Sequence, residues 1–336
     1  MNQKIICAPH DAGEDDPLPW EADAPSGGEI RVVTADLQHH GTRLDKGLAA
    51  WIPELSRSYL AQLIEEGCVR INGKLALKPA IKLSTGQSIE IELRPTPAAS
   101  AFRAEPVPLK IVFEDEHLLV INKPVGLVVH PGSGNWTGTL LNGLLHHHAE
   151  AHNLPRAGIV HRLDKNTSGL MVVAKSRQAM AHLVDQLATR SVQRVYVALA
   201  RGRKAVGDVF EIDQPIGRDP KNRLRMAVVS AGKPAQTEVT VRSAHAPYLM
   251  LRCKLRTGRT HQIRVHMAWC GMPLVGDRLY GGAAELGMEA QALHAHDLSL
   301  VHPVTGATLH WWVPPPPEWL NAAELGGLGY NAASLL

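Results

Sequence analysis

Along residues 41–94 the spacing of apolar side chains changes from that of helices to that of strands. Apolar residues first recur every three or four positions, which predicts two short helices, the second capped by Ser56 and ended by Gly67. Asn72 and Gly73 then predict a tight hairpin turn, and SIEIEL alternates as a strand does. The apolar stripes of the two helices are Leu44, Leu48 and Trp51, and Leu60, Leu63 and Ile64. The pattern therefore predicts a compact module of two helices and a hairpin.

The segments on either side of this module lack an apolar period. Residues 1–30 are rich in Asp, Glu, Pro and Gly, so they predict a flexible acidic arm that buries too little surface to fold. Residues 95–108 are rich in Pro and Ala, which is typical of a linker. We therefore expect a domain boundary there, followed by a second domain over residues 109–325.

The second domain consists mainly of short β-like runs. GIVHRLD and THQIRVHMA are both predicted to be strands. One amphipathic helix is predicted at SRQAMAHLVDQLATR, where Ser176 is the cap and Met180, Leu183, Val184 and Leu187 share a face. The expected fold class is α+β, with a mainly antiparallel, mixed β-sheet and peripheral helices in the second domain, plus the small N-terminal α/β module.

Composition favours a soluble protein. No apolar run approaches the roughly 20 residues that cross a bilayer, and the first residues lack the apolar centre of a signal peptide. We therefore expect a cytoplasmic protein with no membrane contact. The cysteines are far apart in sequence, which favours reduced, mostly buried thiols over disulfides or a zinc ribbon. They are Cys7, Cys68, Cys253 and Cys270.

Charge is distributed unevenly, although the whole chain carries a net charge of only +3. Residues 1–38 hold two basic residues against eight acidic ones. Residues 156–266 hold 21 Lys and Arg against seven Asp and Glu, a balance of +14. Clustered basic side chains favour a polyanionic partner, because they displace counterions from phosphates. A solvated basic face is the alternative.

One carboxylate lies among the basic side chains of GIVHRLDKNTSGLMVVAK, residues 158–175. Asp164 stands beside His161, Arg162 and Lys165 at the mouth of a predicted hairpin. Residues two apart on a strand share a face, so Arg162 and Asp164 are expected to face one space. A structural ion pair, or an Asx turn with KNTS, is the alternative.

The segment LRTGRTHQIRVHMA is a second basic cluster. As a strand it would place Arg264 and His266 on one face and Ile263 and Val265 on the other. The apolar face could then pack on the core while the polar face meets solvent or a ligand.

No metal or cofactor site is indicated. Arginines surround His261 and His266 with no acidic residue nearby, and the adjacent histidines at 146–148 cannot all face one ion, so they fit a helix end better. HPGSGNWTG lacks the third glycine of a dinucleotide-binding loop and fits a turn-rich loop. We therefore expect neither a metal nor a cofactor.

The chemistry must then rest on one carboxylate with basic neighbours. A glycoside hydrolase needs two carboxyl groups, and the polar segments offer no second one. A single carboxylate held ionised by a guanidinium suits attack on a sugar carbon, or removal of a proton from one. With a phosphate-bearing substrate, these features favour glycosidic isomerisation of a nucleotide.

Several blocks closely resemble the signature blocks of the RluA family of pseudouridine synthases. They are LLVINKPVGLVVHPGSGNWTGTLLNGLL, GIVHRLDKNTSGLMVVAK, RVYVALARG, LRTGRTHQIRVHMA and PLVGDRLYGG. Residues 41–93 resemble the S4-type RNA-binding module, and together the blocks span residues 41–320. The combination is most similar to the RluD branch of the family, which modifies a hairpin loop of large-subunit ribosomal RNA.

The resemblance implies that Asp164 is the catalytic aspartate of the isomerisation of uridine to pseudouridine. The C1′–N1 bond would break with help from Asp164, and the uracil would rejoin through C5. Arg264 would pair with Asp164, and Tyr196 would stack on the uracil, whereas a half-buried strand tyrosine is the alternative. The target base must leave its stack, and His161 and Arg162 would fill the vacated space.

The resemblance also implies RNA contacts by basic and polar side chains in both domains. In the second domain these are Arg259, His261 and Gln262, with Arg201, Arg203, Lys204 and the loop KNRLRM as phosphate contacts or solvated loops. In the small module they are Arg43, Arg57, Arg70 and Lys74. The expected partner is large-subunit ribosomal RNA or a pre-ribosomal particle, bound by a monomer. The alternatives are a synthase for transfer RNA or another ribosomal uridine, and a non-catalytic RNA-binding or ribosome-assembly factor.

Overall fold

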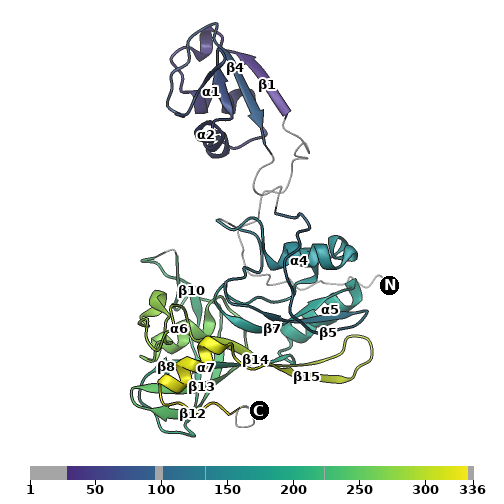
Figure 1. Cartoon of the computed structure of the whole chain (residues 1–336), viewed down its shortest axis with the longest axis vertical. Coiled ribbons are helices and arrows are strands. Elements are labelled where there is room, and N and C mark those ends of the chain that lie inside the picture. Colours follow the sequence, from purple (N-terminus) through teal and green to yellow (C-terminus); the bar gives the residue numbers. More distant parts are fainter. Residues whose placement is uncertain (1–28, 95–100, 133, 223, 332–336) are drawn as a thin grey trace, which may run out of the picture. The chain divides into compact units, whose positions relative to one another are not determined.

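The computed structural model describes residues 29–94, 101–132, 134–222 and 224–331 (Figure 1). The chain divides into two compact units, residues 1–100 and 101–336, and each is described by itself. Almost all of the expected acidic arm, residues 1–28, lies outside the described residues, as do residues 95–100 of the expected linker. The expected domain boundaries therefore stay a prediction.

The smaller unit packs two helices on a four-stranded sheet, with strand order β1-β4-β2-β3. The two helices and the hairpin turn predicted from the sequence are present. Ser56 Oγ accepts a hydrogen bond from the Tyr59 amide, and the hairpin turn has φ of 50° at Asn72 and 76° at Gly73. The elements are β1 (Glu29–Thr34), α1 (Leu44–Trp51), α2 (Arg57–Glu65), β2 (Val69–Ile71), β3 (Lys74–Leu75) and β4 (Ser88–Leu93), with a 3₁₀ turn η1 (Leu37–His39).

Strand β1 was not expected from the sequence. It pairs antiparallel with β4 over its whole length, from Glu29 opposite Leu93 to Thr34 opposite Ser88. Ile30 and Val32 point outward and are exposed. The sequence of this strand therefore shows no clear buried apolar face that would distinguish it from the acidic segment before it. Strand pairing with β4, which is distant in sequence, decides its structure.

The larger unit is built on a nine-stranded sheet with the order β5-β6-β7-β14-β8-β13-β12-β9, and β15 pairs with β14. Only the β7–β14 pair is parallel. The strands are β5 (Ile111–Glu114), β6 (Leu118–Lys123), β7 (Ser168–Ala174), β8 (Gln193–Arg201), β9 (Val209–Asp213), β12 (Gln236–His245), β13 (Tyr248–Leu255), β14 (Leu293–Val301) and β15 (Thr308–Trp312), and β10 (Ile216–Arg218) and β11 (Met226–Val228) form a separate hairpin.

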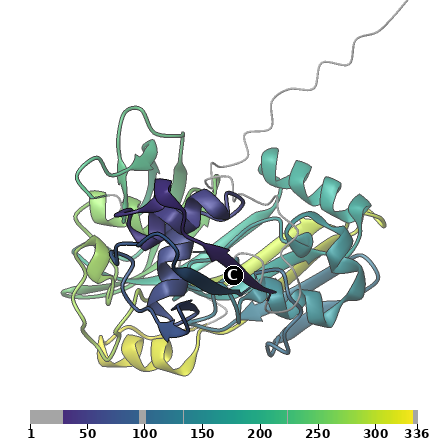
Figure 2. The same cartoon turned by 90° about the horizontal axis from the view of Figure 1, so that it is seen from above.

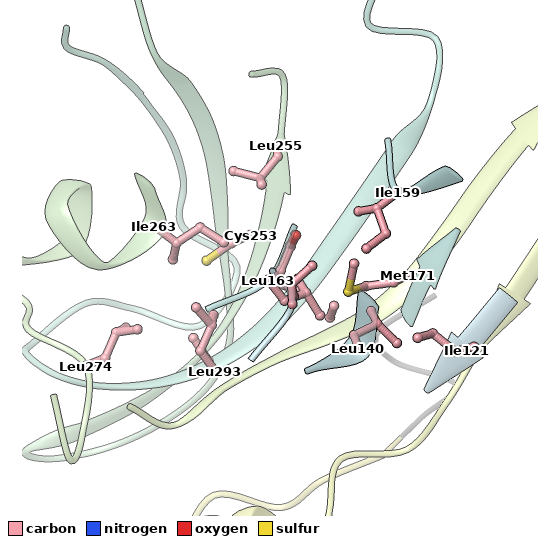
Figure 3. Close-up of a cluster of buried hydrophobic side chains, with 14 of the residues drawn as sticks. Ile121, Leu140, Ile159, Leu163, Met171, Cys253, Leu255, Ile263, Leu274 and Leu293 are labelled. Carbon is pink, nitrogen blue, oxygen red and sulfur yellow. The ribbon is translucent and has the colours of Figure 1, made fainter. Parts of the chain in front are cut away.

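Helices cover both faces of this sheet. Helices α4 and α6 pack on one face over the core cluster that includes Leu140, Ile263 and Leu163 (Figure 3). Helix α5 packs on the opposite face through Leu183. Helix α7 packs through Trp319 on residues of β8 and β13 (Figures 1 and 2). The helices are α4 (Leu140–His147), α5 (Arg177–Ala188), α6 (Gln262–Trp269) and α7 (Pro317–Leu325), with 3₁₀ turns η2 (Ala149–Asn153), η3 (Pro155–Gly158) and η4 (Arg278–Tyr280).

The α+β fold class is therefore confirmed, with a mainly antiparallel, mixed sheet and peripheral helices. The helix predicted after Ser176 is confirmed as α5, whose cap accepts a hydrogen bond from the Ala179 amide. Cys68 and Cys253 are buried thiols, and Cys270 is partly buried, whereas Cys7 lies outside the described residues. In the described parts of the chain no helix is both long and apolar enough to cross a bilayer.

Strand β7 begins at a point that only glycine permits. Gly169 has φ of +113°, and a Cβ atom there would lie 2.2 Å from the carbonyl oxygen of Ala295 on β14. The close approach joins β7 to β14 directly after the loop that carries Asp164. The sheet thus fixes the C-terminal end of that loop.

Candidate active site

Asp164 lies in the loop that precedes β7, not on a strand. Of the predicted strand GIVHRLD, only Ile159 pairs, in an isolated bridge to Val173, so that prediction is wrong. Beyond that bridge the Val172 amide donates to the His161 side chain and not to a backbone carbonyl group, so the strand does not continue. The argument that Arg162 and Asp164 share a strand face therefore fails. Leu163 anchors the loop in the core, and the Asp164 side chain remains 18% exposed.

The segment predicted as the strand THQIRVHMA is instead helix α6. Its apolar positions alternate, which imitates a strand, but the polar residues between them are also buried, so the alternation marks no solvent face. His266, for example, contacts Thr237 Oγ1 at 2.9 Å and the carbonyl oxygen of Gln214 at 3.0 Å. His266 therefore meets buried partners from distant segments and not the expected solvent, and the sequence gives no sign of these partners.

Arg264, on α6, lies between two carboxylates. Its Nη1 donates to Asp164 Oδ2 at 2.9 Å, while Nε and Nη2 donate to the two oxygens of Asp277 at 2.7 and 2.9 Å. Burial acts to lower the pKa of Arg264, but the bonds and charges of Asp277 and Asp164 outweigh it and raise that pKa. The expected pairing of Arg264 with Asp164 is present, and the guanidinium is a fixed cation.

Asp277 was not expected as a site residue. Its side chain is 1% exposed, and it holds the far edge of the guanidinium in a bidentate pair. It stands 13 residues after Arg264, within the block PLVGDRLYGG. Resemblance to a family block was the only sequence signal there, because no local pattern predicts which carboxylate a buried arginine meets.

Tyr280 supports this network from η4. The guanidinium carbon of Arg264 lies 4.9 Å from the Tyr280 ring centroid, a cation–π arrangement. The Tyr280 hydroxyl accepts a hydrogen bond from the Met226 amide at 2.9 Å and lies 2.7 Å from His261 Nδ1. Burial lowers the pKa of His261, and the charge of Asp164 only partly offsets this, so the imidazole is neutral. Its Nε2 atom lies 3.8 Å from Asp164 Oδ1.

Tyr196 projects from β8 toward the face of the sheet that α6 covers. Tyr196 joins the core cluster on that face, where it is 5% exposed, and Val197 joins the cluster on the other face. Burial raises the pKa of Tyr196, the charge of Arg194 opposes the shift, and the charge of Asp164 adds to it. A protonated phenol therefore stands within the electrostatic reach of the carboxylate.

The two residues expected to fill the space of a displaced base differ in placement. The His161 Nε2 atom accepts a hydrogen bond from the Val172 amide at 3.1 Å, which ties the loop to β7. Burial, with a smaller contribution from Arg194, lowers the pKa of His161 to about 3, so its ring is neutral at physiological pH. Arg162 is exposed. Arg162 therefore faces solvent, whereas His161 holds the loop.

Lys123 ends β6 beneath the loop of Asp164 and was not expected there. Its side chain is fully buried, and Nζ donates to the carbonyl oxygens of Pro124, Leu127 and Lys165 at 2.9, 2.9 and 3.0 Å. Burial lowers the pKa of Lys123 to about 7, with the charge of Asp164 opposing the shift. Three carbonyl acceptors use all three hydrogens of an ammonium group. Lys123 thus fixes the backbone next to Asp164.

Replacing Lys123 with methionine should destabilise the protein by about 3 kcal/mol, because three carbonyl groups lose the buried ammonium that donates to all of them. The matched control is Lys165→Met, which removes an exposed ammonium group whose Nζ lies 3.3 Å from Asn135 Oδ1. We expect that control to change stability by less than about 1 kcal/mol. Urea unfolding of both variants measures the difference, and equal unfolding midpoints would show that Lys123 does not fix the loop.

Two residues expected to contact RNA lie in the turn before and at the start of α6. Arg259 is half-buried, and its Nε donates to the carbonyl oxygen of Pro234 at 3.1 Å. Gln262 is 3% exposed, and each of its two amide atoms makes two hydrogen bonds within the protein. Its amide is thus used inside the fold, and its contact with RNA stays a prediction. The partners of Gln262 are Thr257, Arg259, Gln236 and Thr237.

Most of the other basic residues expected to contact phosphates are exposed in the part of the chain that the structure describes. In the larger unit, Arg201 pairs with Glu285, and Arg225 Nε donates to Asp219 Oδ2 at 2.6 Å, so both charges are partly neutralised. Arg203 and Lys204 are exposed, and Arg223 of KNRLRM lies outside the described residues. In the smaller unit the exposed residues are Arg43, Arg57, Arg70 and Lys74.

Within the described ranges, no group of three or more His, Cys, Asp or Glu side chains is arranged to hold a metal ion. The histidine run at 146–148 lies at the end of α4, as expected, and His147 Nε2 pairs with Glu114 at 3.0 Å. The candidate site is built around one partly exposed carboxylate, Asp164.

Comparison with known proteins assigns this arrangement to a family. Residues 117–269 match the family model described as RNA pseudouridylate synthase, and residues 42–89 match the S4 domain. Ribosomal large subunit pseudouridine synthase D of Neisseria meningitidis serogroup A is 48% identical over 299 residues, which is 85% of this chain and 79% of that protein. The chain belongs to the RNA pseudouridylate synthase family. The resemblance predicted from the sequence blocks is confirmed, and this family member is an RNA pseudouridine synthase.

Other relatives of this pseudouridine synthase agree. The synthase D of Pasteurella multocida is 45% identical over 308 residues, covering 87% of this chain and 94% of that protein. The solved structure of human RNA Pseudouridylate Synthase Domain Containing 1 is 28% identical and has a TM-score of 0.51, covering 63% of this chain and 86% of that chain. Asp164, Tyr196 and Arg264 lie within the matched family segment, whereas Asp277 and Tyr280 lie beyond its end.

Proposed function

We propose that this pseudouridine synthase isomerises uridines in a hairpin loop of large-subunit ribosomal RNA, with Asp164 as its catalytic carboxylate. The names of the relatives from Neisseria meningitidis and Pasteurella multocida support the choice of RNA. The observation that carries the proposal is the Asp164 carboxylate, partly exposed and bonded at 2.9 Å to an arginine that Asp277 holds from the other side. Such a carboxylate is accessible, oriented and paired.

The reaction rearranges bonds without a co-reactant. The N1–C1′ bond of uridine breaks, the freed uracil turns in the site, and a C5–C1′ bond forms. The proton leaves C5 and a proton is taken up at N1, so substrate and product are isomers. Asp164 starts the reaction either by attacking C1′ or by removing the C2′ proton. Deuterium at C2′ separates the two routes, because only proton removal produces a primary isotope effect.

Arg264 and Tyr196 have distinct roles in this proposal. The Arg264 guanidinium uses three donors on two carboxylates, so it holds Asp164 in one orientation throughout the reaction. The Tyr196 ring, 5% exposed, lies in the core cluster on the sheet face that α6 covers, and in this proposal it stacks on the uracil once the base has entered the site. The raised pKa of its phenol keeps the hydroxyl protonated at neutral pH.

Replacing Tyr196 with phenylalanine should lower kcat about 100-fold, if the hydroxyl assists proton loss from C5. The aromatic surface remains, so KM and the melting temperature should change little. Single-turnover assays on a hairpin RNA measure the effect. Unchanged kcat would limit Tyr196 to stacking, and Tyr196→Leu, which removes the ring but keeps apolar volume, would then be the variant that loses activity.

We propose that the RNA partner is ribosomal RNA or a pre-ribosomal particle, met by a monomer in the cytoplasm. Residues 156–266 carry a charge balance of +14, which favours a polyanionic partner. The free thiols Cys68, Cys253 and Cys270 are compatible with a reducing compartment. Light scattering of the purified protein, with and without RNA, tests the oligomeric state.

The substrate assignment is tested by mapping pseudouridine in RNA from cells that lack this protein and in large-subunit RNA treated with the purified enzyme. We expect the loss and the gain at the same uridines of a large-subunit hairpin loop. Transfer RNA serves as the comparison substrate. If only transfer RNA is modified, transfer RNA is the substrate. If no RNA is modified, the protein is better explained as a binding or assembly factor.

A further inference from the structure

Two arginines of the smaller unit share one buried carboxylate. Asp45 lies in the first turn of α1 and is 4% exposed. Arg43, just before the helix, and Arg57, at the start of α2, reach it from two sides. The side chains of these arginines are 49% and 53% exposed. A buried anion thus holds two cations at the surface.

The carboxylate of Asp45 is fully used by its neighbours. Oδ1 accepts from Arg43 Nε and the Lys46 amide, both at 3.0 Å. Oδ2 accepts from Arg57 Nε at 3.0 Å, Arg57 Nη2 at 2.8 Å and Arg43 Nη2 at 3.3 Å. Burial acts to raise the pKa of Asp45, but Arg43 and Arg57 outweigh it and lower that pKa. The carboxylate is therefore ionised at neutral pH and fixes one edge of each guanidinium.

The outer edge of each guanidinium is left for another acceptor. Nη1 of Arg43 and Nη1 of Arg57 make no hydrogen bond to the described parts of the chain. A guanidinium held along one edge still offers donors to a phosphate oxygen with the other. Because the side chains are already ordered, binding costs them little conformational entropy. One carboxylate against two guanidiniums leaves the group with a positive charge.

The other two basic residues expected to bind RNA are not held in this way. Arg70 Nη1 reaches only the carbonyl oxygen of Gly73, at 3.5 Å, and no ion pair of Lys74 is recorded among the described residues. Both lie at the β2–β3 turn and are exposed. They add positive charge to the unit, but no neighbouring anion fixes their direction.

We propose that Asp45 is a positioning residue that fixes Arg43 and Arg57 as a single two-armed site for backbone phosphates of the RNA substrate. This inference rests on the proposed function, which supplies the RNA. Arg43 and Arg57 contact phosphate oxygens through their outer edges, and Asp45 acts only through them. Arg70 and Lys74 contribute to affinity through their charge alone.

The deciding variant is Asp45→Asn in the full chain. It raises the net charge by one, so long-range electrostatics alone predicts tighter RNA binding. The proposal predicts the opposite, because the asparagine amide group faces the arginine donors and releases both side chains. We expect about tenfold weaker binding of a labelled large-subunit hairpin RNA. The dependence of log K on log salt should also become shallower, by about 0.7–0.9 for each lost phosphate contact.

The matched control is Glu65→Gln, which makes the same charge change at an exposed position of α2. It should bind RNA as tightly as the native protein or slightly more tightly. Equal affinities of Asp45→Asn and Glu65→Gln would overturn the proposal. Far-ultraviolet circular dichroism and thermal unfolding show whether each variant keeps the smaller unit folded.

A second comparison avoids the buried position. Arg43→Lys with Arg57→Lys keeps all charges but removes the forked donors, whereas Arg70→Lys makes the same chemical change at an unheld arginine. We expect the double lysine variant to bind RNA several-fold more weakly than the native protein, and Arg70→Lys to bind it with native affinity. In the double lysine variant, adding Asp45→Asn should cause little further loss, because the side chains that it positions are already gone. Native affinity of the double lysine variant would also overturn the proposal.

Turnover separates this inference from the proposed function. In Asp45→Asn, KM for the hairpin should rise about tenfold while kcat at saturating RNA stays unchanged. If the native protein modifies the hairpin but Asp45→Asn has native KM, only the phosphate site is refuted. If the native protein neither binds nor modifies the hairpin, the proposed function itself fails.

Discussion

Replacing Asp164 with asparagine is expected to lower the rate of pseudouridine formation by at least about 1,000-fold. The amide cannot attack C1′ and cannot take a proton from C2′, so both routes are closed. Its oxygen can still accept the hydrogen bond that Arg264 Nη1 now donates to Oδ2. The loop is anchored separately by Leu163 and Lys123, so the fold should persist. Single-turnover assays with excess enzyme measure the chemical step directly.

Binding provides the control for this variant. Asp164→Asn should hold the hairpin RNA with an affinity within a few-fold of the native protein, because the basic side chains proposed to contact phosphates are unchanged. Its thermal unfolding should also stay close to native, since Asp164 is partly exposed and the substitution is isosteric. Pseudouridine formation at the native rate by the purified variant would show that Asp164 is not the catalytic residue.

Replacing Arg264 with methionine should cost about 3–5 kcal/mol of stability and abolish activity. The substitution leaves the carboxylate of Asp277, 1% exposed, without its bidentate partner, and an unpaired buried charge is strongly destabilising. Asp164 loses its orienting bond at the same time. Urea unfolding measures the first effect and single-turnover kinetics the second.

Two further variants separate charge burial from catalysis. Arg256→Met removes an exposed arginine of the same segment that pairs with Glu238 at 3.1 Å, and it should change stability by no more than about 1 kcal/mol. Arg264→Met combined with Asp277→Asn removes the buried charge as well, so stability should partly return while activity stays absent. If the double variant is no more stable than Arg264→Met alone, the loss comes from packing and not from an unpaired carboxylate.

Helices and turns whose signals lie within a few neighbouring residues could be predicted from the sequence alone. The two helices of the smaller unit, its Asn72-Gly73 turn and helix α5 with its Ser176 cap all formed where the pattern predicted. In each, the cap, the apolar stripe or the turn pair lies within a few residues, so the local physics is complete in the local sequence. The blocks around Asp164 likewise indicated the family before any contact was known.

The candidate site depended on contacts between distant segments. Asp277 meets Arg264, and Lys123 meets the carbonyl group of Lys165, across 13 and 42 residues of chain. Helix α6 was read as a strand because its buried polar residues find partners that only the folded sheet supplies. Gln262 was expected to face RNA for the same reason.

By itself, the sequence determined the family, the fold class, the locally encoded helices and turns, and the single carboxylate on which the chemistry is proposed to rest. Only the tertiary structure decided which charges are buried, which partners they meet and which arginines are held. Burial and pairing depend on where distant segments meet, and residue order alone does not carry that geometry.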